Sequence, residues 1–237
     1  MTTTSQSSRL TNAAKLAALC AVTASLATAC SLTPPKSGEK SYEVTEKVTS
    51  LRVDDYAGSI EVVGGNSGAV KVTEKYEYSD GKPRTEHSVK GGELLLKNPG
   101  CGADADKCSV KYRVEVPAAV AAHLTLGGGE ITVRGLSGTT YAKSEGGSVQ
   151  VSESSAKTVT ALVDGGDASA SFAAVPDQVR VESGGGDVTV RLPQSTYAVT
   201  AQTDGGDRKV AVKTDPASPH KIKAHTDGGD VSVLSAG

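Results

Sequence analysis

A glycine pair that recurs at a nearly fixed interval is the feature that most constrains the fold of this chain. It is seen in LVDGGDASA, ESGGGDVTV, QTDGGDRKV and HTDGGDVSV. Six residues directly follow such a pair, and their successive separations are 18, 19, 20, 20 and 23 positions. Self-similarity at one period indicates a repeat architecture in which each copy is one small structural unit. We name these six the marker residues: Glu130, Ser148, Asp167, Asp187, Asp207 and Asp230.

Apolar side chains recur at fixed distances from each marker residue. Positions eight and six before the marker are apolar or small, as in Val179 and Val181. Positions one and three after it are apolar, as in Val188 and Val190. Polar residues alternate with them, so each copy is predicted to hold two strands with one buried face and one exposed face. Arg208 alone breaks these columns, which indicates a local irregularity or an exposed strand start.

The columns predict an all-β fold, and specifically a right-handed parallel β-solenoid with coils of about 20 residues. An aromatic content of 3% and 27 glycines also favour short strands and turns over helices. Successive copies would stack in register, so that each inward column becomes a ladder. The alternative is an antiparallel β-sandwich or meander, with the glycine pair in a hairpin turn. We favour the solenoid because one inward column holds small residues that suit a narrow interior: Ala142, Ala161, Ala201 and Ala224.

The segment before the regular repeats is predicted to be an elaborated first module, residues 42–121, which leads into repeats over residues 122–237. It holds one earlier copy of the corner, at Ser59, and several further strand-like stretches. Cys101 and Cys108 lie in its glycine-rich loop NPGCGADADKCSV. In an oxidising compartment this pair favours a disulfide over two free thiols. Closing so short a loop would contribute about 2–3 kcal/mol.

The first 30 residues have the layout of a bacterial export signal. Arg9 and Lys15 come first, Asp and Glu are absent, and the apolar stretch LAALCAVTASLATAC follows. That stretch is too short to span a bilayer and ends in small residues, as a cleaved signal does. The residues ATAC resemble the lipobox of bacterial lipoproteins, which implies a diacylglycerol on Cys30; soluble secretion and an uncleaved anchor are the alternatives. We predict a signal peptide over residues 1–29, then the lipidated cysteine and a flexible tether over residues 30–41.

The distribution of charged residues indicates which ligands the chain can be expected to bind. A net charge of −2 gives no basic footprint for phosphates, so nucleic acid is not an expected partner. If the coils stack in register, the acidic markers form a column that could offer oxygen ligands to Ca²⁺. Against this, known calcium solenoids repeat every nine residues, and aspartate suits turns because it accepts hydrogen bonds from nearby backbone N–H groups. We therefore expect no cofactor or metal, and the calcium column is kept only as an alternative: Asp167, Asp187, Asp207 and Asp230.

No catalytic residues are predicted. The four histidines belong to no recognisable nucleophile or metal motif; they are His87, His123, His220 and His225. Enzymes that process polysaccharides do use β-solenoids, so such an enzyme remains an alternative.

Several stretches together indicate a family. VEVP leads into the first regular repeat and ITVRGLSG follows its glycine pair, after an earlier LRVDDYAGSIEV. In these stretches the chain resembles a bacterial family of exported β-strand-repeat domains that are provisionally named adhesins and have no known function. The resemblance covers roughly residues 42–236 and implies an exported or membrane-anchored domain without catalytic residues.

The sequence thus predicts a lipid-anchored protein on the extracytoplasmic face of the cell membrane. Its single domain, residues 42–237, would have a structural, adhesion or binding role without enzymatic chemistry. The expected partners are the membrane, through the lipid on Cys30, and an envelope protein or polymer of unknown identity. A cell-wall polysaccharide-processing enzyme and a calcium-binding repeat protein are the alternatives.

Overall fold

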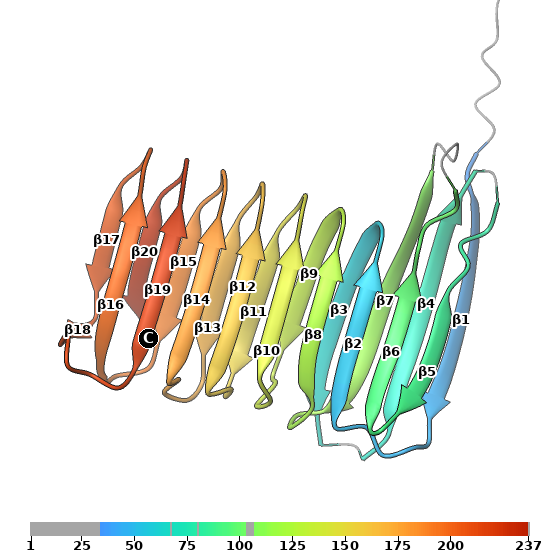
Figure 1. Cartoon of the computed structure of the whole chain (residues 1–237), viewed down its shortest axis with the longest axis horizontal. Coiled ribbons are helices and arrows are strands. Elements are labelled where there is room, and N and C mark those ends of the chain that lie inside the picture. The colour runs from blue at the N-terminus through green and yellow to red at the C-terminus, as the bar shows by residue number, and fades with distance from the viewer. Residues whose placement is uncertain (1–33, 67, 80, 103–106, 237) are drawn as a thin grey trace, which may run out of the picture. The chain divides into compact units, whose positions relative to one another are not determined.

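The computed structural model describes residues 34–66, 68–79, 81–102 and 107–236, and all regular structure in them is β-strand. None of these residues forms a helix long and apolar enough to cross a membrane. The strands form two ten-stranded sheets that face each other (Figure 1). In spatial order the first sheet consists of β1 (Lys36–Val44), β4 (Val70–Tyr78), β7 (Cys108–Pro117), β3 (Gly58–Gly65), β9 (Gly129–Arg134), β11 (Val149–Ser154), β13 (Ala168–Phe172), β15 (Val188–Leu192), β20 (Val231–Ser235) and β17 (Arg208–Ala211). The second consists of β18 (Lys213–Thr214), β16 (Thr196–Thr203), β19 (Lys221–Thr226), β14 (Gln178–Ser183), β12 (Thr158–Val163), β10 (Thr140–Ser144), β8 (Ala121–Leu126), β2 (Ser50–Asp55), β6 (Glu93–Asn98) and β5 (Glu86–Lys90).

Strand pairing in the repeats is parallel and follows the predicted columns. Thr140 pairs with Val159, and Val159 pairs with Val179, each eight positions before its marker. Each copy therefore contributes one strand to each sheet, and the copies stack as in a solenoid. The parallel prediction is confirmed and the antiparallel alternative is wrong for the repeats. Antiparallel pairs occur only at the N-terminal end of the described stack, between β1, β4 and β7 and between β5 and β6.

The order of the last two coils differs from the prediction that copies stack in sequence order. The coil β19–β20 lies between β14–β15 and β16–β17 (Figure 1), so Ile222 pairs with Val179 on one side and Val199 on the other. The inward columns of this coil hold apolar residues that are at most 1% exposed, so the coil needs a neighbour on each side; they are Ile222, Ala224, Val231 and Val233. The coil with Arg208 carries a charge in its inward column, which is costly to bury. That coil therefore lies at the end, where Arg208 is exposed.

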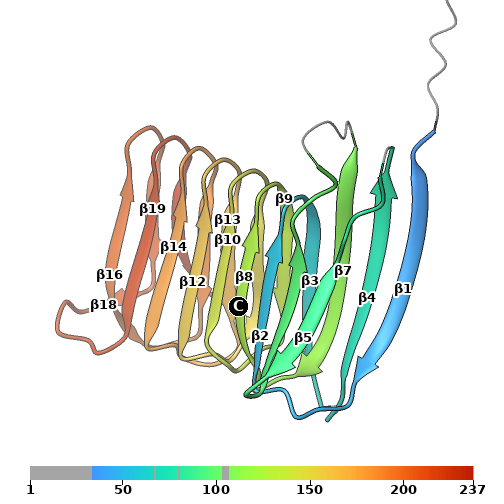
Figure 2. The same ribbon diagram turned by 45° about the vertical axis from the view of Figure 1, so that its right-hand side comes forward.

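At the N-terminal end, too, the order of the coils in space differs from their order in the sequence. The coil β2–β3 lies between β6–β7 and β8–β9, so the chain moves outward to β6 and β7 and then passes back to β8. Figure 2 shows β7, β4 and β1 continuing the first sheet beyond this coil.

The folded domain begins earlier than predicted. β1 starts at Lys36 and pairs with β4 along its whole length, whereas the sequence predicted a flexible tether up to residue 41. An edge strand with mostly exposed polar residues lacks the apolar alternation that would identify it. The predicted signal peptide and Cys30, the predicted site of lipidation, lie outside the described residues.

Ladders of apolar side chains fill the space between the sheets. Val159, Ala161 and Val181 are fully buried, as their columns predicted. Burying one valine side chain in this way contributes about 1.5–3 kcal/mol. The interior between the sheets is therefore an apolar core along these columns.

Side chains close the N-terminal end. Tyr42 of β1 stacks on His87 of β5 with ring centroids 4.5 Å apart, so the last strands of the two sheets touch. Glu74, buried nearby, accepts hydrogen bonds from Tyr42 and Thr85, both 2.7 Å, and from Tyr76. Three hydroxyl groups thus compensate the burial of this carboxyl group.

The predicted disulfide is confirmed. Cys101 and Cys108 are bonded, with their Cα atoms 5.8 Å apart, and Cys108 is the first residue of β7. The bond ties the start of β7 to the loop that follows β6.

Candidate functional site

The acidic markers form a ladder of hydrogen bonds along one edge of the stack. Asp167 Oδ1 accepts the backbone N–H of Asp187 at 2.9 Å, and Asp187 Oδ1 accepts that of Asp230 at 2.8 Å. Asp230 Oδ1 in turn accepts the N–H of Asp207 at 2.8 Å. The column therefore exists, but in the order 167, 187, 230, 207. One oxygen of each of the first three carboxylates joins neighbouring coils, which gives aspartate a structural role at the marker.

The second glycine of the last three pairs makes room for this ladder. A Cβ atom on Gly186 would lie 2.6 Å from Asp167 Oδ1, and one on Gly229 would lie 2.6 Å from Asp187 Oδ1. Both would also lie within 2.6 Å of the neighbouring coil's backbone. By contrast, Gly165 and Gly185, the first glycines of their pairs, face open space. Close stacking of the coils thus explains the second glycine.

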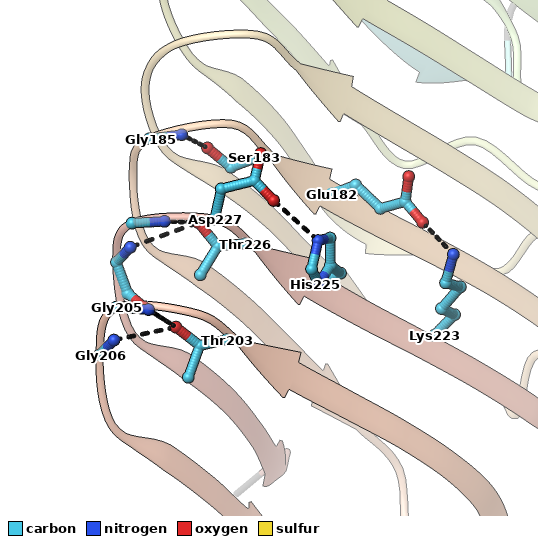
Figure 3. Close-up of polar contacts among 12 residues, drawn as sticks. Glu182, Ser183, Gly185, Thr203, Gly205, Gly206, Lys223, His225, Thr226 and Asp227 are labelled. Carbon is cyan, nitrogen blue, oxygen red and sulfur yellow. Dashed lines mark hydrogen bonds and ion pairs between the residues drawn. The ribbon is translucent and has the colours of Figure 1, made fainter.

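A hydroxyl four positions before the marker completes the corner, and the sequence analysis missed it. Ser183 accepts the N–H groups of Gly185 and Gly186 and donates to the carbonyl of Gly166 at 2.6 Å. Thr203 and Thr226 make the equivalent contacts (Figure 3). The recurring Ser or Thr at this position was the available signal.

These contacts define the glycine corner as a structural joint between coils. Its N–H groups bond to hydroxyl and carboxylate oxygens of the chain itself. Among the described residues, no group of three or more His, Cys, Asp or Glu side chains is arranged to hold a metal ion.

The outer face of the second sheet carries a candidate site. Thr160, Arg180, Lys223 and Thr200 lie side by side on the parallel strands β12, β14, β19 and β16. Around them is a shallow hollow of about 540 Å³, which we call the basic hollow. It is lined by Thr158, Val159, Thr160, Gln178, Val179, Arg180, Ala198, Thr200, Lys221, Ile222 and Lys223.

Glu182 organises the cations beside the basic hollow. Its carboxylate lies 2.6 Å from Arg180 and 2.7 Å from Lys223 Nζ (Figure 3). The hydrogen bond from Arg180, aided by Lys223, outweighs partial burial and lowers the pKa of Glu182 to about 2. Within the described residues Lys221 makes no ion pair, so its charge is available to a ligand. Three cations against one carboxylate leave the hollow net positive.

A second hollow of about 600 Å³ continues this face toward the glycine corner, and its lining is mainly acidic: Asp164, Glu182 and Asp227 against Lys143. His225 Nε2 lies 2.9 Å from Asp227 (Figure 3), and Lys143 lies 3.7 Å from Asp164. Beyond it, the rings of His123 and Tyr141 stack with centroids 4.5 Å apart. In the described part of the chain no hydroxyl or thiol side chain is hydrogen-bonded to a histidine ring.

The stacked coils define a β-repeat domain of the solenoid kind, with a polar outer face on the second sheet. The chain belongs to the Toastrack DUF4097 family, whose model matches residues 103–234. This confirms the resemblance found in the sequence. A comparison with curated proteins gives no significant match.

Several crystal structures are similar at low identity. One is of a protein from Clostridium sporogenes ATCC 15579, provisionally described as a cell adhesion protein: it is 17% identical with a TM-score of 0.48, over 85% of this chain and 100% of that one. Another, provisionally described as an adhesin from Bacteroides fragilis NCTC 9343, is 14% identical with a TM-score of 0.35, over 85% and 97% of the two chains. A third, from Parabacteroides distasonis ATCC 8503 and provisionally described as lipid-binding, is 10% identical with a TM-score of 0.24, over 84% and 97%.

Proposed function

We propose that this protein is a non-catalytic binding domain of the cell envelope that holds an extended anionic polymer against the second sheet. The observation that carries the proposal is the basic hollow, where Arg180, Lys221 and Lys223 converge on a flat sheet face. A chain with a net charge of −2 that gathers cations at one place offers a local attraction for negative charge. The hollow is open and shallow, which suits a polymer better than a small enclosed substrate.

Neutralising two cations of the basic hollow is expected to weaken polymer binding. In Lys221→Gln/Lys223→Gln the affinity for polygalacturonate should fall roughly five- to ten-fold at low salt, since exposed charge pairs are each worth up to about 1 kcal/mol. Titration of the purified protein by fluorescence anisotropy or calorimetry measures this. Binding should also weaken as salt rises, because salt screens exposed charges.

The matched control is Lys111→Gln/Arg191→Gln, which makes the same change in net charge on the outer face of the first sheet. It should bind polygalacturonate as the unmodified protein does, and neutral dextran should bind to neither. Equal losses in the two double variants would mean that the basic hollow is not the site.

We also propose that the coils wind right-handed and contain about 20 residues each. Paired positions are 18, 19 and 20 residues apart, from Ala122 to Thr140, Thr140 to Val159 and Val159 to Val179. Connections between parallel strands of one sheet are right-handed in about 98% of cases. An experimental structure would test the handedness directly.

We further propose that a lipid on Cys30 holds this domain at the extracytoplasmic face of the cell membrane. The lipobox-like ATAC after an apolar export signal supports this. In Cys30→Ala, the protein should appear in the medium or stay unprocessed, whereas the unmodified protein should partition with membranes and carry radiolabelled palmitate. A cleaved Cys30→Ala product that still sediments with membranes would contradict the anchor.

A further inference from the structure

One row of outward side chains crosses the second sheet along the length of the stack. Tyr141 of β10 pairs with His123 of β8 on one side and with Thr160 of β12 on the other. Thr160 pairs in turn with Arg180 of β14, and Arg180 pairs with Lys223 of β19. The aromatic pair and two cations of the basic hollow therefore lie in the same row, with Thr160 between them.

The ring of Tyr141 has one face directed toward the basic hollow. The rings of Tyr141 and His123 are nearly parallel, with an interplanar angle of 12° and centroids 4.5 Å apart. This separation is close to the spacing of neighbouring strands, about 4.7–4.9 Å, so the two rings stand side by side along the row. His123 thus covers one face of the tyrosine ring, and the opposite face is directed toward Thr160. Tyr141 is partly exposed, and Thr160 itself lines the basic hollow.

The surroundings of Tyr141 suit an uncharged sugar. Tyr141 also lines the second hollow, together with Leu162, Asp164 and Asp227. The mainly acidic lining of that hollow repels an anion, but its carboxylates can accept hydrogen bonds from hydroxyl groups. The face of an aromatic ring offers an apolar surface to the C–H groups of a sugar ring. An anionic group is instead attracted to the neighbouring basic hollow.

We propose that the polymer held by this face is an acidic polysaccharide in which neutral sugars stand between anionic ones. A neutral sugar packs on Tyr141, and an anionic sugar lies at Arg180, Lys221 and Lys223. This inference rests on the proposed function and names its ligand class. Tyr141 and Lys223 are three strand spacings apart, about 14 Å, so the polysaccharide runs across the strands along the row. A polymer of like charge without sugar rings would contact the cations alone.

Tyr141→Ala separates the contact with the sugar from the contact with the charge. Its affinity for hyaluronan, in which N-acetylglucosamine alternates with glucuronate, should fall roughly three- to ten-fold, the range that one aromatic contact supplies. Its affinity for inorganic polyphosphate, which has no sugar ring, should be unchanged. Lys221→Gln/Lys223→Gln should instead weaken the binding of both polymers. Calorimetry of the full-length purified protein at low salt measures all four affinities.

Two tyrosine variants serve as controls. Tyr141→Phe keeps the ring and should bind hyaluronan as the unmodified protein does. Tyr56→Ala removes a tyrosine that is 62% exposed between β2 and β3, and it should leave both affinities unchanged. Melting curves confirm that each variant is folded.

Three results would overturn the proposal: an unchanged affinity of Tyr141→Ala for hyaluronan, an equal loss for polyphosphate, or no binding of hyaluronan by a protein that binds polyphosphate. The proposed function fails in a different way. If the double lysine variant binds both polymers normally while Tyr141→Ala loses affinity for hyaluronan, the basic hollow is not the anionic site and the contact with the sugar stands.

Discussion

Replacing Gly166 by alanine is expected to destabilise the domain by about 3–5 kcal/mol, the sum of a close contact and backbone strain. A Cβ atom there would lie 2.0 Å from the carbonyl oxygen of Gly147 in the neighbouring coil. Gly166 also has φ at +138°, a conformation that L side chains rarely adopt. Relief would require these two coils to separate at the corner, which would stretch the backbone hydrogen bonds from Gly147 to Gly165 and from Val149 to Asp167, 3.2 and 3.0 Å long. Urea unfolding followed by circular dichroism measures the loss.

The adjacent Gly165→Ala is the matched control. Its Cβ atom would meet nothing within 4 Å, and its φ is not in the positive region. We expect it to change stability by no more than about 0.5 kcal/mol. If the two alanine variants unfold at the same urea concentration, stacking does not explain the second glycine of the pair.

The sequence predicts the repeated unit of this fold but not the order in which the units stack. The period, the inward columns and the corners follow from spacing alone, because parallel stacking repeats the same environment in each copy. The order of the coils does not follow, since all copies share nearly the same columns and fit beside one another in several orders. Arg208 was the local clue, because a charged inward residue belongs to a coil with water on one side.

The basic hollow depends on that order. Lys223 of β19 lies beside Arg180 of β14 only because the last coil in the sequence inserts before the coil of β16. If the coils stacked in sequence order, Thr200 of β16 would lie beside Arg180 instead of Lys223. Val179 and Val199 occupy the same column of the repeat, so Arg180 and Thr200, which follow them, would be paired. The cations that converge on Glu182 thus come from strands that the sequence pattern does not make neighbours. A site of this kind is found only once the strand order is known.

Asp55 is expected to make the free energy of unfolding of the domain depend on pH. It lies at the end of β2, 5% exposed, in the column that holds the corner hydroxyls of later coils. Asn98 donates to its Oδ1 at 2.7 Å, but its Oδ2 has no hydrogen-bond partner among the described residues. Burial raises the pKa of Asp55 to about 7, and hydrogen bonds from Asn98 and the backbone of Ala57 and Tyr56 oppose this only in part.

The sign follows from comparing the two states. In the unfolded chain an aspartate has a pKa of about 3.9, so between pH 4 and 7 the folded state binds the extra proton. The contribution of Asp55 to stability is therefore fully present below about pH 4 and is lost as the pH rises through 7, a total of about 3–4 kcal/mol. Glu182, with its lowered pKa of about 2, acts in the opposite direction and only below this window.

Asp55→Asn isolates this effect because it keeps the shape and removes the charge. Urea unfolding at pH 4.5 and pH 8 should show the variant close to the unmodified protein at the lower pH and more stable by a few kcal/mol at the higher pH. Asp207→Asn, at the exposed end of the ladder, controls for the loss of one carboxylate elsewhere. Parallel profiles for Asp55→Asn and the unmodified protein would show that Asp55 is not protonated in the folded domain. A variant less stable at both pH values would instead mean that its new amide N–H₂ group is buried without an acceptor, which costs about 1–3 kcal/mol.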